Sequence, residues 1–381
     1  MQETPYILHL DGGSFVTRRS YESQLIDAMN ARGLMEMGCA ATTIGAFDLF
    51  RGGEYLKGLI ADHGLPVVSA NVYDESTGEL FVEPYVIVER AGVKFGITGA
   101  LDPGADIRTH NSVEQLGVII GEPMETLPAV LEELNKKADY VILLSQLGLE
   151  QSKLLAEEIP GIDFMVLGSE AQYAAEPFEV GSTVVLQSGY KGQRLSDCRL
   201  QFDEANVYLG YSGTTLELGD KVPSDAAMAL LLKEHKIAIE DATKRRAAAN
   251  RSAAKPSESL YREECLGAEA TCGRCHKPQM DQWAETAHAR AFATLENAHQ
   301  ATNPECLRCH TTCYLDMPLD GSVSVANALK DVQCESCHGK ATEHARDGSY
   351  GSVTASTCGR CHDKENSPNF DFAEYLPKVT H

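Results

Sequence analysis

The sequence contains no long apolar run: nowhere in its 381 residues do 18 or more apolar residues follow one another. A helix needs about 20 such residues to span a bilayer, so we expect a soluble protein with no integral membrane segment. The start, Met1-Gln2-Glu3-Thr4, also lacks the basic residues and the apolar stretch of a signal peptide. If the protein is exported, this sequence therefore corresponds to a mature or recombinant form.

Positive charge is scarce. The chain has 33 Lys and Arg against 55 Asp and Glu, a net charge of −22. Residues 1–220 carry 14 basic and 33 acidic side chains, a balance of −19, whereas residues 221–381 carry 19 and 22, a balance of −3. Binding to nucleic acid or to an anionic membrane surface depends on clustered Lys and Arg. We therefore predict no nucleic-acid partner.

Cysteine is nearly absent from the first two thirds of the chain, because 10 of the 12 cysteines follow residue 260. This clustering indicates a separate C-terminal domain in a chain long enough for two. We predict one domain over residues 1–220, a helical linker over 221–262 and a second domain over 263–381. The linker is rich in Ala, Leu, Lys and Glu from Ser224 to about Ala249, which predicts one long helix, and Asn250–Ser259 with Pro256 predicts a break.

Four copies of the motif Cys-x-x-Cys-His lie in this C-terminal part. In chain order, as the first to fourth motifs, they are Cys272/Cys275/His276, Cys306/Cys309/His310, Cys334/Cys337/His338 and Cys358/Cys361/His362. The two thiols of such a motif bond to the vinyl groups of one haem, and the next residue, His, ligates the iron. A zinc site does not require a His after every second Cys. The motifs therefore predict four covalently bound c-type haems.

A second imidazole on the far side of each iron would complete its coordination. Beyond the motif histidines, the region holds four candidates: His288, His299, His344 and His381. His288 falls on a predicted helix, Gln282–Ala298, whose apolar side can face a haem. His299 is the weakest candidate, because a plain residue at the end of that helix explains it equally well.

Residues 263–381 resemble the cytochrome c-554 family of tetrahaem proteins. The matching residues are Cys272, Cys275, His276, Trp283 and His288-Ala-Arg-Ala291; Asn303-Pro-Glu-Cys306 through His310-Thr-Thr; Val332-Gln-Cys334 through His338-Gly339 with His344; and Asn369-Phe-Asp371 with His381. The resemblance implies a mostly helical, loop-rich fold around closely stacked haems, with distal ligands at His288, His344 and His381. Members of the family can leave one haem without a distal protein ligand, and only His299 remains for that position here.

Four cysteines lie outside the motifs. The family pattern usually has Gly where this chain has Cys313, and we slightly favour a disulfide between Cys313 and Cys265 over a free thiol near a haem. Cys39 and Cys198 are either small buried apolar residues or a disulfide, and the sequence does not decide between them.

Residues 1–220 alternate between short apolar strands and amphipathic helices, which predicts an α/β layered sandwich. The predicted strands are Tyr6–Leu10, Ala41–Gly45, Pro66–Ala70, Tyr85–Val88, Val93–Thr98, Tyr140–Ser145, Phe164–Gly168, Thr183–Gln187 and Cys198–Phe202. The predicted helices are Tyr21–Ala31, Glu54–Asp62, Glu125–Lys137 and Gln151–Glu158.

The order of segments resembles the metal-dependent phosphoesterase domain of periplasmic 5′-nucleotidases. The resemblance lies in framework stretches: Leu10–Ser14, Met37–Asp48, Val67–Val72, Gly92–Gly99, Leu144–Gly148 and Gly161–Ser169. Such enzymes hold two metal ions with Asp, Asn and His. Here the matching positions are Ser14, Ala46, Phe47, Gln146, Ser169 and Ala171. Most of these cannot ligate metal, so we expect a fold kept without its metals and without phosphoesterase activity.

We therefore predict a multihaem cytochrome of the periplasm or cell exterior that relays electrons between redox protein partners. We expect low potentials, because two imidazoles favour ferric haem and no Met occupies an obvious axial position. Three alternatives remain open. One is a haem enzyme acting on a small nitrogen or sulfur species at a five-coordinate iron. Another is a homo-oligomer or filament in which His381 serves a neighbouring subunit. The third, an active nucleotidase, would bind divalent metal besides iron.

Overall fold

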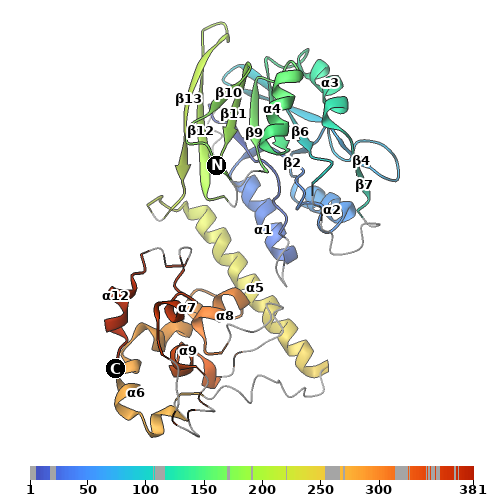
Figure 1. Cartoon of the computed structure of the whole chain (residues 1–381). Coiled ribbons are helices and arrows are strands. Elements are labelled where there is room, and N and C mark those ends of the chain that lie inside the picture. Colours follow the sequence, from blue (N-terminus) through green and yellow to red (C-terminus); the bar gives the residue numbers. More distant parts are fainter. Residues whose placement is uncertain are drawn as a thin grey trace. The chain divides into compact units, whose positions relative to one another are not determined.

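The chain forms two compact units, Met1–Leu232 and Lys233–His381, in a computed structural model (Figure 1). The structure describes residues 6–17, 23–105, 107, 116–169, 172–189, 192–219, 221–253, 267–268, 271–313, 325, 327–339, 341, 344, 348, 352–363, 366–367 and 369–381. No helix within these ranges is both long enough and apolar enough to cross a membrane.

The N-terminal unit is built on a six-stranded sheet with the order β10-β11-β9-β8-β6-β5. Its strands are β5 (Tyr85–Arg90), β6 (Val93–Leu101), β8 (Tyr140–Gln146), β9 (Phe164–Leu167), β10 (Phe178–Val180) and β11 (Thr183–Gln187). The four central strands are mutually parallel, and β5 and β10 pair antiparallel at the two edges. Strands β6 and β8 are buried along nearly their full length, as expected for parallel strands covered on both faces.

Three smaller sheets complete this unit. A parallel sheet joins β1 (His9–Leu10), β2 (Cys39–Thr43) and β3 (Val67–Val68). Two antiparallel pairs are β4 (Val72–Asp74) with β7 (Val118–Ile120), and β12 (Arg194–Phe202) with β13 (Tyr208–Glu217). The hairpin β12–β13 turns one face toward the large sheet, where Phe202 and Tyr208 meet Tyr140 and Phe164 in an aromatic cluster.

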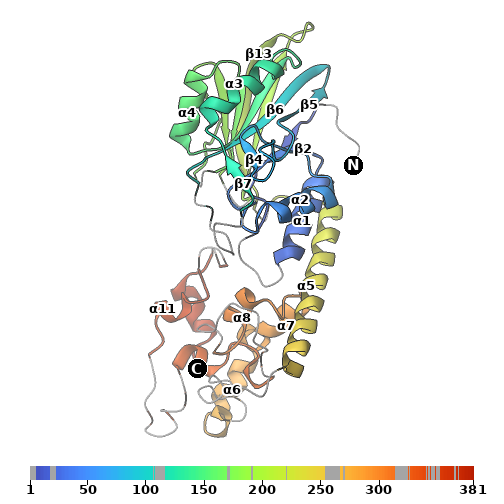
Figure 2. The same ribbon diagram turned by 90° about the vertical axis from the view of Figure 1, so that its right-hand side faces the viewer.

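Helices cover both outer faces, which gives four layers. Helices α3 (Pro123–Leu134) and α4 (Leu149–Glu158) lie on one face of the six-stranded sheet, where Leu131 packs near Met165 (Figure 2). The opposite face of this sheet packs Ile142 against Ala41 of the three-stranded sheet. Helices α1 (Ser23–Glu36) and α2 (Gly53–His63) then cover the three-stranded sheet. The predicted α/β layered sandwich is confirmed.

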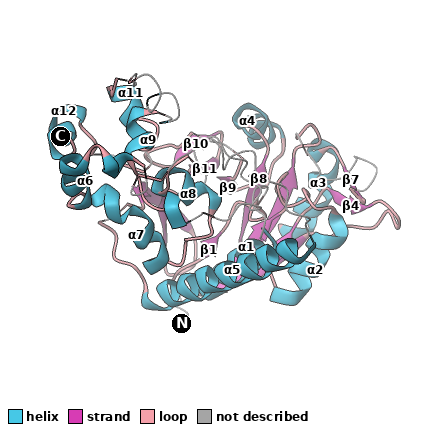
Figure 3. Ribbon diagram, turned by 90° about the horizontal axis from the view of Figure 1, so that it is seen from below, coloured by secondary structure: helices cyan, strands magenta, loops and turns pink. Residues whose placement is uncertain are grey.

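Apart from the long helix α5, the C-terminal unit consists of short helices and loops, and Figure 3 shows the strands gathered in the other unit. Its elements are α5 (Ala226–Ala253) from Lys233 onward, then η2 (Cys272–Arg274), α6 (Lys277–Ala284), η3 (Ala287–Arg290), α7 (Ala291–Asn297), α8 (Pro304–His310), η4 (Asn327–Leu329), α9 (Cys334–His338), α11 (Ala355–Cys358), α12 (Phe372–Tyr375) and η5 (Leu376–Lys378). Its apolar core in the described residues is small, comprising the buried side chains Phe292, Leu295 and Leu307. The predicted helical, loop-rich fold is confirmed.

Two sequence predictions about helices need correction. The single helix expected over Gln282–Ala298 is wrong, because the chain is extended at Thr286 and divides into α6, η3 and α7. The Thr286 hydroxyl donates to the Trp283 carbonyl, and this local hydrogen bond competes with helix continuation. The long helix is present as α5, but it continues to Ala253, through part of the predicted break. The proline at 256 disfavours helix at the residue before it, not four residues earlier.

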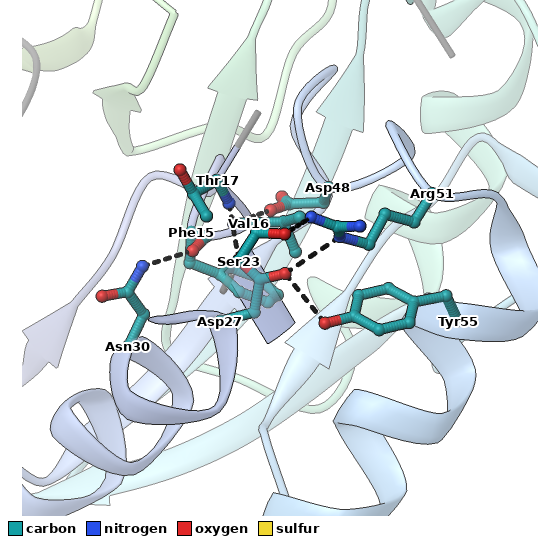
Figure 4. A network of polar contacts seen from close by, with 9 residues as sticks. All are labelled: Phe15, Val16, Thr17, Ser23, Asp27, Asn30, Asp48, Arg51 and Tyr55. Atoms are coloured by element: carbon teal, nitrogen blue, oxygen red, sulfur yellow. Dashed lines mark hydrogen bonds and ion pairs between the residues drawn. The ribbon is translucent and has the colours of Figure 1, made fainter. Parts of the chain in front are cut away.

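A buried polar network ties the loop after β1 to α1 and α2 (Figure 4). Its centre is Asp27, whose side chain is fully buried. One Asp27 oxygen accepts the backbone N–H of Thr17 at 2.7 Å, and the other accepts Tyr55 Oη–H at 2.8 Å and Arg51 Nε–H at 3.2 Å. Arg51 also donates to Ser23. The charge of Asp27 is therefore fully paired, as a buried carboxylate requires.

Replacing Asp27 with Ala should destabilise the N-terminal unit by on the order of 3 kcal/mol, because it leaves the Thr17 N–H and the Arg51 charge without a buried acceptor. Urea unfolding followed by far-UV circular dichroism of the β-sheet band measures this loss. The matched control is Glu132→Ala, which removes an exposed carboxylate paired with Lys136 and should leave the unfolding midpoint unchanged. Equal midpoints for the two variants would contradict the role given to Asp27.

Candidate functional site

Each of the four motifs forms a single helical turn. The second and third motifs are the helices α8 and α9. In the first, the N–H of His276 donates to the Cys272 carbonyl at 3.0 Å, and in the fourth, the N–H of His362 donates to the Cys358 carbonyl at 2.9 Å. Residues three and four apart share one side of a helical turn. The local fold therefore presents both thiols and the following imidazole of each motif on the same side, as one haem requires.

Three of the four motif histidines face a second imidazole from a distant part of the chain. The ring centroids are 5.9 Å apart for His276 and His344, 6.2 Å for His288 and His362, and 5.7 Å for His338 and His381. Each pair joins a motif histidine to one of the distal candidates. The structure thus brings His288, His344 and His381 to the positions that the family resemblance implied for them.

These spacings fit a metal ion between the two rings. Bonds from a metal to imidazole nitrogen are about 2 Å long, so two imidazoles on opposite sides of one ion have ring centroids roughly 6 Å apart. The residues present therefore fit haem iron, with one motif imidazole and one distal imidazole as axial ligands. Haem itself supplies the redox change between ferric and ferrous iron when it is bound.

Outer partners orient two of the motif imidazoles. His310 Nδ1 lies 2.8 Å from the Ala291 carbonyl, to which it donates, and 3.1 Å from Thr294 Oγ1. His362 Nδ1 lies 2.9 Å from Ser367 Oγ, and the ring of Phe370 stacks on the imidazole with centroids 4.6 Å apart. Fixing Nδ1 in this way leaves Nε2 free to bind iron. The sequence motifs do not reveal these partners, because each comes from a separate helix or loop.

The second motif differs from the others. Among the described histidines, none has a ring that faces His310 at the spacing of the three pairs. The remaining candidate, His299, instead places Nδ1 2.9 Å from Glu240 Oε2 on α5. The structure therefore places one of the four candidate histidines beside each of three motif histidines.

Cysteines of different motifs lie close to one another. The thiols of Cys272 and Cys334 are near enough to interact electrostatically, as are those of Cys309 and Cys361. Cys337 and Cys358 are also near enough for their charges to interact. With haem bound, such cysteines would carry thioether sulfurs at the porphyrin edges. This closeness places the first motif beside the third, the third beside the fourth, and the fourth beside the second.

Gln333, just before the third motif, anchors several segments at once. Its side-chain oxygen accepts the N–H of Ala268 at 2.6 Å, its amide donates to the Lys330 carbonyl at 2.6 Å, and its backbone N–H donates to Thr312 Oγ1 at 2.9 Å. Thr312 lies two residues after the second motif, so this contact fixes the second and third motifs relative to each other. The resemblance included Gln333, but nothing in the sequence indicated this role.

In the N-terminal unit, hydrogen bonds join the residues at and around the positions that match a dinuclear metal site. Asp48 is fully buried and accepts the backbone N–H groups of Ser14 and Gly45 at 2.8 Å and of Val16 at 2.9 Å. Gln146 donates to the Gly12 carbonyl, and its other side-chain atom lies 3.5 Å from Ser14 Oγ. Backbone donors thus occupy both oxygens of the Asp48 carboxylate.

The backbone around these positions is closely packed. Gly13 has φ +91°, and a Cβ added there would lie 2.6 Å from the Thr43 carbonyl oxygen. A Cβ on Gly168 would collide with the Gly12 carbonyl and with Gln146. Phe47, at the position of an expected ligand, is 42% exposed and apolar, whereas Ala171 lies outside the described residues. The described side chains do not fit a dinuclear metal centre.

The cysteines outside the motifs are partly resolved. Cys39 and Cys198 are both free, and burial raises the pKa of the Cys39 thiol to about 12, which keeps it protonated. The structure thus excludes the disulfide alternative for this pair. Cys313 is disulfide-bonded, as we favoured, and its predicted partner, Cys265, lies outside the described residues.

The C-terminal unit matches a known family. Residues 271–339 fit the family model described as cytochrome c554 and c-prime. This match confirms the resemblance stated from the motifs. It supports covalently bound c-type haem and a role of this part of the chain in electron transfer.

The N-terminal unit is similar to phosphoesterases. A 5′-nucleotidase of Vibrio cholerae is 30% identical over 159 residues, which are 41% of this chain and 28% of that protein. YunD of Bacillus subtilis, an uncharacterized metallophosphoesterase, is 27% identical over 184 residues, 48% of this chain and 38% of its own length. The chain thus spans well under half the length of these relatives.

Solved structures show the same fold. The sulfate thiohydrolase SoxB of Thermus thermophilus, in complex with glycerol, superposes with a TM-score of 0.55 at 21% identity, covering 61% of this chain and 43% of that one. A 5′-nucleotidase precursor from the same organism gives a TM-score of 0.54 at 21% identity, covering 61% and 49%. The N-terminal unit therefore has the metallophosphoesterase fold.

Replacing His381 with Ala should convert one low-spin haem to a high-spin haem, because it removes the imidazole that faces His338. Electron paramagnetic resonance of the oxidised protein at low temperature measures this as one additional high-spin signal. His63→Ala, at the end of α2, is the matched control and should leave the spectrum unchanged. A His381→Ala spectrum identical to wild type would show that His381 is not an axial ligand.

The buried Asp48 should make the N-terminal unit less stable as pH rises. Burial raises the pKa of Asp48 from 3.8 to about 7. Its contribution to stability is therefore fully present below pH 4 and is lost as pH rises through 7, by on the order of 4 kcal/mol at most. Unfolding midpoints between pH 4 and pH 8 measure the slope. Asp48→Asn, which has similar size and does not titrate, should flatten it, and parallel slopes for both proteins would contradict this assignment.

Proposed function

We propose that the chain is a tetrahaem c-type cytochrome that relays electrons between redox partner proteins. The observation that carries the proposal is the set of three histidine pairs, His276–His344, His288–His362 and His338–His381, with ring centroids 5.7–6.2 Å apart. Two imidazoles on one iron change little in geometry between ferric and ferrous states and leave no open position. Such irons suit electron transfer better than substrate chemistry.

The contacts between motif sulfurs suggest the path of the electrons. They support a chain of haems in the order first, third, fourth and second motif. In this order, the haems of the first and second motifs form the two ends of the chain. We propose that electrons enter at one of these ends and leave at the other, and that the bis-histidine irons have low potentials.

We place this function in the periplasm or at the cell exterior, since covalent c-type haem is assembled outside the cytoplasm. The N-terminal unit would then serve as an acidic docking module for partner proteins. Residues 1–220 carry a balance of −19 charges, which attracts partners with basic surfaces and speeds their encounter at low ionic strength. His381 faces His338 of its own chain, so the proposal does not need a second subunit to complete the haem site of the third motif.

A second candidate function follows from His310. Its described surroundings hold the Ala291 carbonyl and the Thr294 hydroxyl at Nδ1, and its ring faces no second histidine. An iron bound at the second motif would then have one protein ligand and one open position. Such an iron could bind and reduce or oxidise a small nitrogen or sulfur species, with the other three haems supplying or removing electrons.

Iron analysis, the pyridine haemochrome spectrum and electron paramagnetic resonance together test these proposals. We expect about four irons per chain, all as c-type haem, with three low-spin signals and one high-spin signal. The reduced protein should bind carbon monoxide at about one haem in four. Fewer than three low-spin haems would contradict the electron relay, and four low-spin haems without carbon monoxide binding would rule out the second candidate.

A further inference from the structure

Helix α5 brings charged side chains to the second motif. The part of α5 from Lys233 onward belongs to the same compact unit as the motifs. Lys236, Glu240 and Lys244 follow one another at four-residue spacing, so they line one side of the helix. The Lys236 ammonium is close enough to the Cys306 thiol to interact with it electrostatically. One turn further along, Glu240 contacts His299.

The backbone of His299 is fixed by the end of α7. The N–H of Gln300 donates to the Leu295 carbonyl at 2.8 Å and the N–H of His299 donates to the Glu296 carbonyl at 3.2 Å, which together form a Schellman motif. This motif requires a left-handed residue, and His299 has φ +55°. Because the main chain is held, only side-chain rotation can move the His299 imidazole.

His299 lies in the neighbourhood of the second motif. Gln300 Oε1 is 3.8 Å from the Cys306 sulfur, and His310 contacts Ala291 and Thr294 on the same helix that His299 terminates. With a rise of about 1.5 Å per residue, Thr294 and His299 are separated by roughly 7.5 Å along the axis of α7. A rotated His299 side chain is therefore near enough to approach a haem held by this motif.

In the structure, however, Glu240 holds the imidazole. The Glu240 side chain is only 12% exposed, with Oε2 2.9 Å from His299 Nδ1 and Oε1 2.7 Å from Lys244 Nζ. The hydrogen bond from Lys244 lowers the pKa of Glu240, so this group is a charged and strong acceptor. The three other distal histidines already face their motif partners, whereas His299 faces a carboxylate.

We propose that Glu240 is a positioning residue that holds the His299 imidazole away from the iron of the second motif, so that the sixth position of that iron stays open. The inference rests on the proposed haem binding. It assigns to α5, which lies outside the residues that match the cytochrome family, a control over the spin state and ligand access of one haem. Glu240 acts through His299 and touches neither haem nor substrate.

The test compares spin states in a series of variants of the full, haem-loaded chain. Wild type should show one high-spin haem by electron paramagnetic resonance. In Glu240→Ala, His299 is released and should bind the iron, so the high-spin signal and carbon monoxide binding at that haem should fall. The expected shift is roughly tenfold to a hundredfold, the factor associated with a hydrogen bond to a charged group.

Three further variants separate this role from a structural one. Glu240→Gln keeps an oxygen that accepts from Nδ1–H and should retain the high-spin signal. Glu240→Ala combined with His299→Ala should restore it. Asp241→Asn, an exposed carboxylate next to Glu240 on α5, is the matched control and should change nothing.

Two results would overturn the proposal. An undiminished high-spin signal in Glu240→Ala with full haem content would show that Glu240 does not restrain His299. Four low-spin haems in wild type, with one becoming high-spin in His299→Ala, would show that His299 ligates iron while Glu240 holds it. The single variant His299→Ala decides the matter even if Glu240→Ala does not fold. A haemochrome spectrum without c-type haem would instead refute the proposed function.

Discussion

The C-terminal unit depends on one geometric constraint: three of its motif histidines each face a second imidazole across a gap of the size of a metal ion. The constraint joins segments far apart in the sequence, since His338 pairs with the last residue, His381, and His288 pairs with His362. The described apolar core of this unit is only Phe292, Leu295 and Leu307 with a few partly buried neighbours. So small an apolar core contributes little to the free energy of folding. Bound porphyrins would then be the main apolar groups around which these short helices pack.

The N-terminal unit keeps the metallophosphoesterase fold although other residues stand at the positions of the metal ligands. Two buried carboxylates hold the loop after β1, Asp48 through the N–H groups of Ser14 and Val16, and Asp27 through that of Thr17. Gln146 closes the remaining gap with a hydrogen bond to Gly12. The loop that would carry metal ligands in a phosphoesterase is therefore stabilised by the protein alone. A loop stabilised in this way is compatible with the proposed role of the N-terminal unit as a docking module for partner proteins.

Much of this architecture could be predicted from the sequence. The strands β6, β8 and β11 are continuous apolar runs between helices, and their bounds differ from prediction by at most a few residues because burial on both faces leaves a clear signal. The strands β4 and β10 were missed, since three residues carry no recognisable period, and the ten-residue strand β13 was missed as well. The four motifs were recognisable because haem attachment fixes their residue types and spacing, whereas the three distal histidines were implied by the family resemblance.

Contacts between distant side chains could not be predicted. Glu240 was one acidic residue among several on a long helix, and only the folded unit reveals that its carboxylate meets His299. Gln333 likewise has no local sequence signature. Its side-chain amide contacts Ala268 and Lys330, and its backbone N–H donates to Thr312 beside the second motif. The helix break at Thr286 depends on its hydroxyl, which donates to the Trp283 carbonyl and competes with the helical hydrogen bonds. In the sequence, the helical pattern of the surrounding residues conceals this local effect.

The closeness of Cys309 to Cys361, and of Cys272 to Cys334, has a consequence for biogenesis. Each pair joins two different attachment sites. If the polypeptide folded before haem was attached, an oxidising compartment would convert these contacts into disulfides, and each wrong bond would block two sites at once. Haem attachment to these motifs would therefore require that the thiols stay reduced and the chain stays unfolded until each haem is bound.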